Sequence, residues 1–177
     1  MNEERRLKKI GQRLVHKGPI ASVREDTFQY GDGTQDTRQV VVHPGAVGIV
    51  AHDGKVVYMV RQPREAVEEE GLLEIPAGKL DVAEESPLEA AQRELGEEIG
   101  KAAGDWRDLR SFYTSPGFCT ERCHLFLATE LYDVDEQAAD DERIEVVRVP
   151  LEELDRTIAE SRDAKSLVGL LMLRDLL

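Results

Sequence analysis

One short segment constrains the fold more than any other, because both its start and its end are marked. Ser86 is a good helix N-cap, Pro87 fits the first helical position, and Glu89 completes an S-x-x-E capping box. Gly100 is the residue type that commonly follows a last helical turn. The segment therefore predicts a helix over 87–99, preceded by a strand that Pro76 ends.

The flanking sequence is dominated by strand signals. Asp53-Gly54 lies between two β-rich runs, 46–51 and 56–60, which is typical of a tight β-hairpin. Further elements follow at regular intervals: strands near 72–75, 109–113, 124–131 and 144–149, and helices over 151–160 and 164–176. One central helix and two late helices among many strands predict an α/β fold with a mixed sheet.

The first 40 or so residues are the least core-like part of the chain. Gly31-Asp32-Gly33 is a turn between 27–30 and 38–42, which predicts a hairpin. Upstream, Leu7, Ile10 and Leu14 recur at helical spacing, although a strand could also start near Gln12. A hairpin with so few apolar residues is unstable alone in water, so we expect it to lie on the main body or on a second copy of the chain.

Charge excludes several classes of protein. Asp and Glu number 36 against 23 Lys and Arg, for a net charge of −13, which disfavours binding to nucleic acid or to an anionic membrane. No apolar run approaches the roughly 20 residues that span a bilayer, and the first ten residues are too charged for a secretory signal. Cys119 and Cys123 are too few for a disulfide scaffold, and C-x3-C with no second pair is a weak zinc signal. We expect a cytoplasmic protein.

The central helix concentrates negative charge. Glu94, Glu97 and Glu98 are spaced i, i+3 and i, i+4, so their carboxylates share one face, opposite an apolar stripe of Leu88, Ala91, Leu95 and Ile99. Such crowding costs a few tenths of a kcal/mol per pair, and a hard divalent cation such as Mg²⁺ would remove it. The alternative interpretation is an ordinary solvated face rich in Glu.

The segment from Gly78 to Lys101 resembles the Nudix box, G-x5-E-x7-R-E-U-x-E-E-x-G-U, through Gly78 and Arg93-Glu94-Leu95-Gly96-Glu97-Glu98-Ile99-Gly100. The interval from Gly78 to Arg93 is one residue longer than the pattern, so either Glu84 or Glu85 fills the early glutamate position. We prefer Glu85, because a loop absorbs an insertion more easily than a capped helix. Outside the box, 42–47, 60–62, 73–80 and Ser115-Pro116-Gly117-Phe118 look like the ADP-ribose pyrophosphatase branch of the family.

This resemblance implies a Nudix α/β/α sandwich with a mixed sheet over 43–177. It also implies an N-terminal β-rich dimerisation subdomain over 1–42, with strands swapped across a homodimer. The implied reaction is Mg²⁺-dependent hydrolysis of the diphosphate of ADP-ribose to AMP and ribose 5-phosphate, with Mn²⁺ as a possible substitute. The alternatives are a pyrophosphatase for another nucleoside diphosphate sugar, such as GDP-mannose, and a non-catalytic ADP-ribose sensor.

The resemblance also assigns roles to residues near the box. Glu94, Glu97 and Glu98 would bind metal together with the carbonyl of Ala77, and Glu97 and Arg93 would assist catalysis, with Arg93 paired to the early glutamate. The catalytic base would come from the acidic run Asp140-Asp141-Glu142, with Glu142 preferred and both aspartates left open.

Substrate contacts are expected from two regions. Arg61 and Arg64 could hold phosphate or ribose oxygens through fork-like hydrogen bonds, although Arg64 could equally pair with Glu65 or Glu68. The resemblance implies a second region of substrate contacts at Pro116, Gly117 and Phe118. It also places Glu121 near the terminal ribose, with an ordinary surface glutamate as the alternative.

Overall fold

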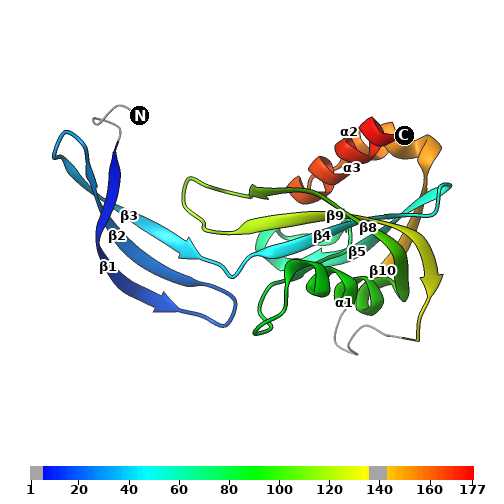
Figure 1. The fold of residues 1–177 in the computed structure, drawn as a ribbon, viewed down its shortest axis with the longest axis horizontal. Coiled ribbons are helices and arrows are strands. Elements are labelled where there is room, and N and C mark those ends of the chain that lie inside the picture. The colour runs from blue at the N-terminus through cyan, green and yellow to red at the C-terminus, as the bar shows by residue number, and fades with distance from the viewer. Residues whose placement is uncertain (1–5, 136–142) are drawn as a thin grey trace. The chain divides into compact units, whose positions relative to one another are not determined.

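The computed structural model describes residues 6–135 and 143–177 and divides into two compact units (Figure 1). The first unit contains the described residues up to Gly45 together with Tyr113–Arg122. The second contains the described residues of Ala46–Phe112 and Cys123–Leu177. The subdomain boundary expected after residue 42 stays a prediction.

The first unit is an antiparallel sheet of three strands in the order β1 (Leu7–Lys17), β2 (Ser22–Tyr30) and β3 (Gln35–Val42). The predicted hairpin is confirmed: Gln29 pairs with Gln35 across a turn in which Gly33 has φ 85°. The helical spacing of Leu7, Ile10 and Leu14 is misleading, because these residues lie on a strand that has irregularities after Lys9 and Leu14.

The first unit leaves large apolar side chains exposed, among them Leu7, Leu14 and Ile20. In contrast, the side chain of Asp26 is buried, and its Oδ2 accepts a hydrogen bond from Nε of Arg24 at 2.9 Å. None of the described residues of this unit belongs to a buried apolar cluster, in agreement with the low apolar content of its sequence.

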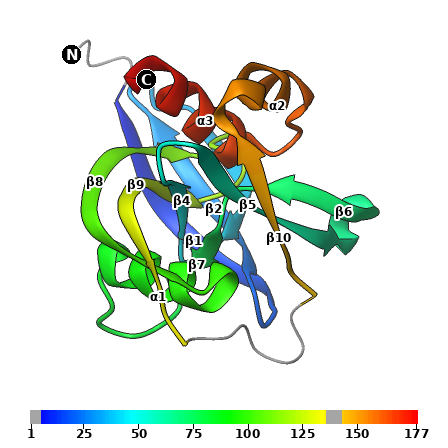
Figure 2. The same cartoon turned by 90° about the vertical axis from the view of Figure 1, so that its right-hand side faces the viewer.

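The second unit is built on a mixed sheet (Figure 2). Within the described residues its strands run in the order β10 (Glu145–Pro150), β5 (Val56–Arg64), β4 (Ala46–His52), β9 (Arg122–Asp133) and β8 (Lys101–Tyr113). Two further strands, β6 (Glu69–Glu74) and β7 (Ala77–Lys79), pair with β5 and β4. β4 runs parallel to β9 and antiparallel to β5, so the predicted mixed sheet is confirmed.

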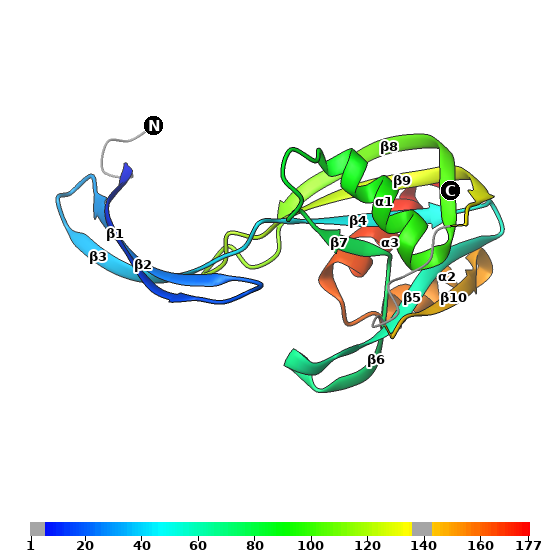
Figure 3. The ribbon, with the colours of Figure 1, turned by 90° about the horizontal axis from the view of Figure 1, so that it is seen from below.

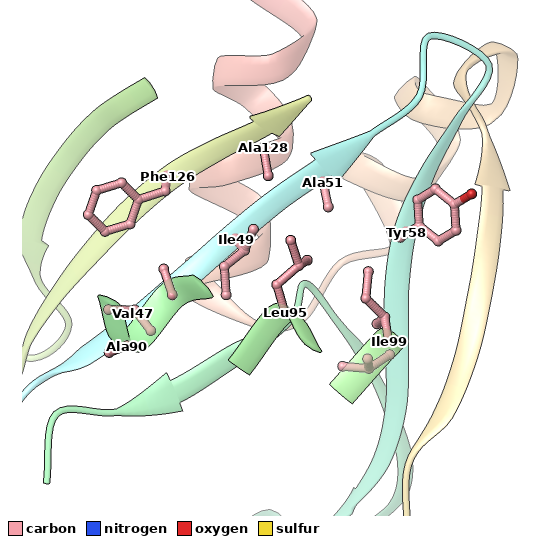
Figure 4. Close-up of a cluster of buried hydrophobic side chains, with 11 residues drawn as sticks. Val47, Ile49, Ala51, Tyr58, Ala90, Leu95, Ile99, Phe126 and Ala128 are labelled. Carbon is pink, nitrogen blue, oxygen red and sulfur yellow. The ribbon is translucent and has the colours of Figure 1, made fainter. Parts of the chain in front are cut away.

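Helices cover both faces of this sheet (Figure 2). Helix α1 (Pro87–Ile99) packs Leu95 and Ile99 on one face, in a buried cluster with Val47, Ile49 and Tyr58 (Figure 4). Helices α2 (Leu154–Glu160) and α3 (Ala164–Leu176) cover the other face, in a cluster that contains Val57, Met59, Leu154, Leu170 and Leu173. The three layers are the predicted α/β/α sandwich.

Helix α1 has the bounds that its sequence predicts. The Ser86 hydroxyl accepts from the backbone N–H of Glu89, the Glu89 carboxylate accepts from the N–H of Ser86, and Gly100 closes the helix at φ 64°. Leu88 departs from the expected apolar stripe, because it is 38% exposed while its neighbour Ala90 is fully buried.

Several other element boundaries differ from the sequence prediction. β8 begins at Lys101 rather than near 109, although its first half lacks alternating apolar residues; Trp106 there packs edge-on against Phe126 of β9. Helix α2 is preceded by a 3₁₀ turn at Leu151–Glu153, and another 3₁₀ turn lies at Glu65–Val67. The short strand β7 was not expected. No helix in the described part of the chain is long and apolar enough to cross a membrane.

The capping box of α1 yields a stability prediction. Ser86→Ala removes the hydroxyl that accepts from Glu89, so the free energy of unfolding should fall by about 1 kcal/mol in urea denaturation. Gln92→Ala, on the exposed face of the same helix, is the matched control and should change stability by less than about 0.5 kcal/mol. Equal effects of the two substitutions would contradict the role of the cap.

Candidate active site

The site is built where α1 passes over β7 (Figure 3). β7 pairs with β4, with Gly78 opposite Val47, and the preceding carbonyl of Pro76 accepts from the N–H of Ile49 at 2.8 Å. The backbone from Pro76 to Lys79 is therefore fixed to the sheet on one side. On another side, Ala77 and Gly78 contact the acidic face of α1.

Two glutamates of α1 reach this backbone. Glu98 is only 7% exposed, and its Oε2 accepts from the N–H of Ala77 at 2.9 Å. Glu94, one turn earlier, lies so close to Gly78 that a Cβ there would overlap its carboxyl group. The absence of a side chain at position 78 thus makes room for Glu94, which is a physical reason for the glycine that opens the box.

Arg93 donates hydrogen bonds to three neighbouring carboxylates. Its Nη1 donates to Glu94 at 2.8 Å and to Glu97 at 2.7 Å, and its Nε donates to Glu85 at 2.9 Å. The hydrogen bond with Glu85 is the main cause that raises the pKa of Arg93, with Glu94 and Glu97 adding to it. The structure therefore pairs Arg93 with Glu85, while Glu84 has φ 67° in the turn before the helix.

The carboxylate oxygens at this site are ligands of the type that a hard cation prefers, although they are not grouped as a complete metal site. Among residues 6–135 and 143–177, no three His, Cys, Asp or Glu side chains are grouped closely enough to hold a metal ion. Glu94 and Glu98 nevertheless offer carboxylate oxygens beside the same strand, in a space that a Cβ at Gly78 would fill. Mg²⁺ keeps several water ligands and needs only a few protein oxygens, so these residues fit it.

Arg64 lies within electrostatic range of this site. It binds neither Glu65 nor Glu68 but Glu74, through a bidentate pair from Nε and Nη2, both at 2.7 Å. The hydrogen bond with Glu74 raises the pKa of Arg64 and outweighs the opposing effect of burial; the charge of Glu98 raises it further. The structure thus places Arg64 of β5 within electrostatic range of Glu98 of α1.

Arg61 lies elsewhere. Side chains alternate along a strand, and Val57 and Met59 belong to the cluster under α2 and α3, whereas Tyr58 and Val60 belong to the cluster under α1. Arg61 therefore shares the face of Met59, where it donates to the carbonyl of Gly71 at 3.3 Å and lines a pocket beside the end of α2. The structure does not bring Arg61 together with Glu94 and Glu98.

The second predicted substrate region belongs to the first unit. Pro116 and Gly117 are exposed in a turn that the N–H of Phe118 closes on Ser115, and Phe118 is 57% exposed. Glu121 accepts from the Thr114 hydroxyl at 2.5 Å, and its other oxygen lies 3.4 Å from Nδ1 of His43.

Two further expectations concern the acidic run and the cysteines. Asp140, Asp141 and Glu142 lie outside the described residues, so the choice of base stays a prediction. Neither Cys119 nor Cys123 is in a disulfide with another described residue, and Cys123 is buried.

Sequence reasoning overlooked the most buried acidic side chain near the site. Glu74 is 1% exposed and also accepts from Lys165 of α3 at 2.5 Å. Burial by itself would raise the pKa of Glu74, but the hydrogen bond from Arg64 and the charge of Lys165 outweigh it, and the pKa is lowered. The available signal was a charged residue inside the apolar run 72–75.

Comparisons with known proteins agree with this geometry. A profile of the NUDIX domain matches residues 42–168. The ADP-ribose pyrophosphatase of Bacillus subtilis is 39% identical over 160 residues, covering 88% of this chain and 84% of that protein. The ADP-ribose pyrophosphatase of Mycobacterium tuberculosis is 43% identical over 126 residues, covering 71% and 60%. The crystal structure of an ADP compounds hydrolase superposes with a TM-score of 0.85 at 22% identity, covering 97% of this chain and 94% of that one, and so shares the fold.

The fold and the acidic helix define a hydrolase scaffold of the Nudix type, and the chain belongs to the NUDIX domain family.

The fit between Gly78 and Glu94 leads to a test of metal binding. Gly78→Ala should displace the Glu94 carboxyl group and weaken Mg²⁺ binding at least about tenfold, measured as a smaller metal-dependent rise in melting temperature. The control is Gly11→Ala, whose added Cβ meets nothing closer than 3.6 Å. Unchanged metal response in Gly78→Ala would refute the assigned fit.

The lowered pKa of Glu74 gives a pH dependence with a definite sign. The unfolded carboxyl has a pKa of about 4.3, so the stabilisation is complete above about pH 5 and is lost as pH falls through the lower folded-state pKa. Glu74→Gln should therefore be less stable than wild type at pH 7 and should lose less further stability between about pH 5 and pH 3. Chemical denaturation at several pH values between about 5 and 3 measures how the free energy of unfolding of each protein changes with pH. Equal changes in the variant and the wild type would exclude the prediction.

Proposed function

We propose that this protein hydrolyses the diphosphate bond of ADP-ribose with the help of Mg²⁺, giving AMP and ribose 5-phosphate, and that Mn²⁺ can replace Mg²⁺. The observation that carries the proposal is the approach of Glu94 and Glu98 to the backbone of Ala77 and Gly78. The choice of ADP-ribose is supported by the two ADP-ribose pyrophosphatases that the chain resembles.

The acidic residues would hold the metal. Glu94, Glu98 and the carbonyl of Ala77 would be its ligands, with Glu97 assisting. When bound, Mg²⁺ neutralises diphosphate charge and lowers the pKa of a bound water. Arg93 would keep the unbound carboxylates ordered, because it already bonds to Glu94 and Glu97.

The cationic and basic groups would act on the substrate. Arg64 would place its guanidinium on a phosphate oxygen, since its position is fixed by Glu74 and lies in the field of Glu98. Glu142, or else Asp140 or Asp141, would take the proton of the attacking water. Arg61, Pro116, Gly117 and Phe118 would be further substrate contacts, and Glu121 would lie near the terminal ribose.

We also propose that the protein works as a cytoplasmic homodimer with swapped N-terminal strands, without nucleic acid or membrane partners. Leu7 and Leu14 on β1 and Ile20 after it are exposed, and no described residue of this unit belongs to a buried apolar cluster, which supports a second copy of the chain as the partner that covers them. Light scattering at micromolar concentration should give twice the chain mass, and a monomer would exclude the dimer.

The activity is tested by offering ADP-ribose, GDP-mannose, NADH and diadenosine polyphosphate with Mg²⁺ and separating the products by chromatography. AMP should form fastest from ADP-ribose, and Glu98→Gln should reduce its rate by about 100-fold or more. Glu160→Gln, an exposed carboxylate on α2, should retain the wild-type rate.

The competing functions give different results in the same assay. Faster turnover of GDP-mannose would support the proposed metal site but would show that ADP-ribose is not the preferred substrate. Binding of ADP-ribose without turnover of any compound would favour a sensor and overturn the enzymatic proposal.

A further inference from the structure

The carboxylate of Glu74 is shared by two cations from distant parts of the chain. Nη2 of Arg64 donates to Oε2 of Glu74 at 2.7 Å, and Nζ of Lys165 donates to the same oxygen at 2.5 Å. Glu74 is 1% exposed and the side chain of Lys165 is 15% exposed, so water screens this contact little. Lys165 therefore helps to fix the plane of the carboxylate that orients Arg64.

Lys165 is itself held by the start of α3. Its Nζ lies 3.0 Å from Oδ2 of Asp163, the residue that caps this helix by accepting from the N–H of Ser166 at 2.9 Å. The fully buried hydroxyl of Ser166 donates to Asp163 and accepts from the N–H of Ile75 at 2.8 Å. The first turn of α3 is thus bonded to both Glu74 and Ile75, directly before the strand that faces Glu98.

The geometry leaves one part of Arg64 available. Its Nε and Nη2 are both occupied by Glu74, while Nη1 makes no hydrogen bond or ion pair with any residue in 6–135 and 143–177. The four charges of Arg64, Lys165, Glu74 and Asp163 sum to zero, so the cluster itself adds no net charge beside the site. A guanidinium fixed along one edge presents its free edge in a defined direction.

We infer that Lys165 is a positioning residue for the proposed diphosphatase reaction: it fixes Glu74, and through Glu74 it aims Nη1 of Arg64 at a phosphate oxygen of the substrate. This inference rests on the proposed function. It extends the site to α3, a helix on the opposite face of the sheet from α1 that supplies none of the proposed ligands.

A set of three single substitutions tests the inference by steady-state kinetics with ADP-ribose at saturating Mg²⁺. Lys165→Met removes the cation and keeps the length of the side chain, so KM should rise roughly tenfold while kcat changes less than about threefold. Lys165→Arg restores the cation and should return KM to within about threefold of wild type. Arg162→Met removes an exposed pair with Glu69 in the same segment and should leave both constants unchanged.

Stability is measured alongside, because Lys165→Met leaves Glu74 with one cation. If that variant is unfolded, Lys165→Met with Asp163→Asn restores the charge balance, and the same rise in KM is expected of the folded double variant. A folded Lys165→Met variant with the wild-type KM would overturn the inference and leave the proposed function standing. A Lys165→Arg variant whose KM is as high as that of Lys165→Met would do the same. A wild-type protein that does not hydrolyse ADP-ribose would overturn the proposed function, and the inference with it.

Discussion

The contact between α1 and β7 is the interaction on which the candidate site depends. The N–H of Ala77 donates to Glu98, and the missing side chain of Gly78 admits Glu94. Both contacts require a particular position of the helix along its own axis and a particular rotation about that axis relative to the strand. The capping box at Ser86, the buried Leu95 and the terminal Gly100 set that position and rotation, so local helix signals and core packing jointly determine where the carboxylates lie.

Near the candidate site, two clusters of ion pairs bring arginine or lysine side chains next to carboxylates. Arg93 donates to Glu85, Glu94 and Glu97 and offsets one of their three negative charges. Arg64 and Lys165 neutralise Glu74 where β6 ends, and that buried carboxylate stays ionised because two cations donate to it. A buried charge pair seldom adds much stability compared with apolar packing, whereas it does restrict orientation. The main effect of the buried Arg64–Glu74 pair is therefore to fix the orientation of Arg64.

The sequence was most informative where a local pattern determines the structure. The cap at Ser86 and the Gly at position 100 predict both ends of α1, and the spacing of the glutamates predicts their common face. Prediction failed where partners are distant: Glu74 and Lys165 are 91 residues apart, and no local period marks such a pair. For Arg61 the structure adds what a motif position does not reveal, namely the face of β5 on which the side chain lies, and its contact with substrate stays a prediction.

Mn²⁺ binding tests most directly, and without relying on turnover, whether the acidic face of α1 beside β7 is a metal site. Electron paramagnetic resonance of free Mn²⁺ should show that the wild type removes the ion from solution at micromolar to millimolar protein. A variant carrying both Glu94→Gln and Glu98→Gln, folded by circular dichroism, should leave the free signal nearly undiminished. Equal Mn²⁺ binding by the variant and the wild type would contradict the account.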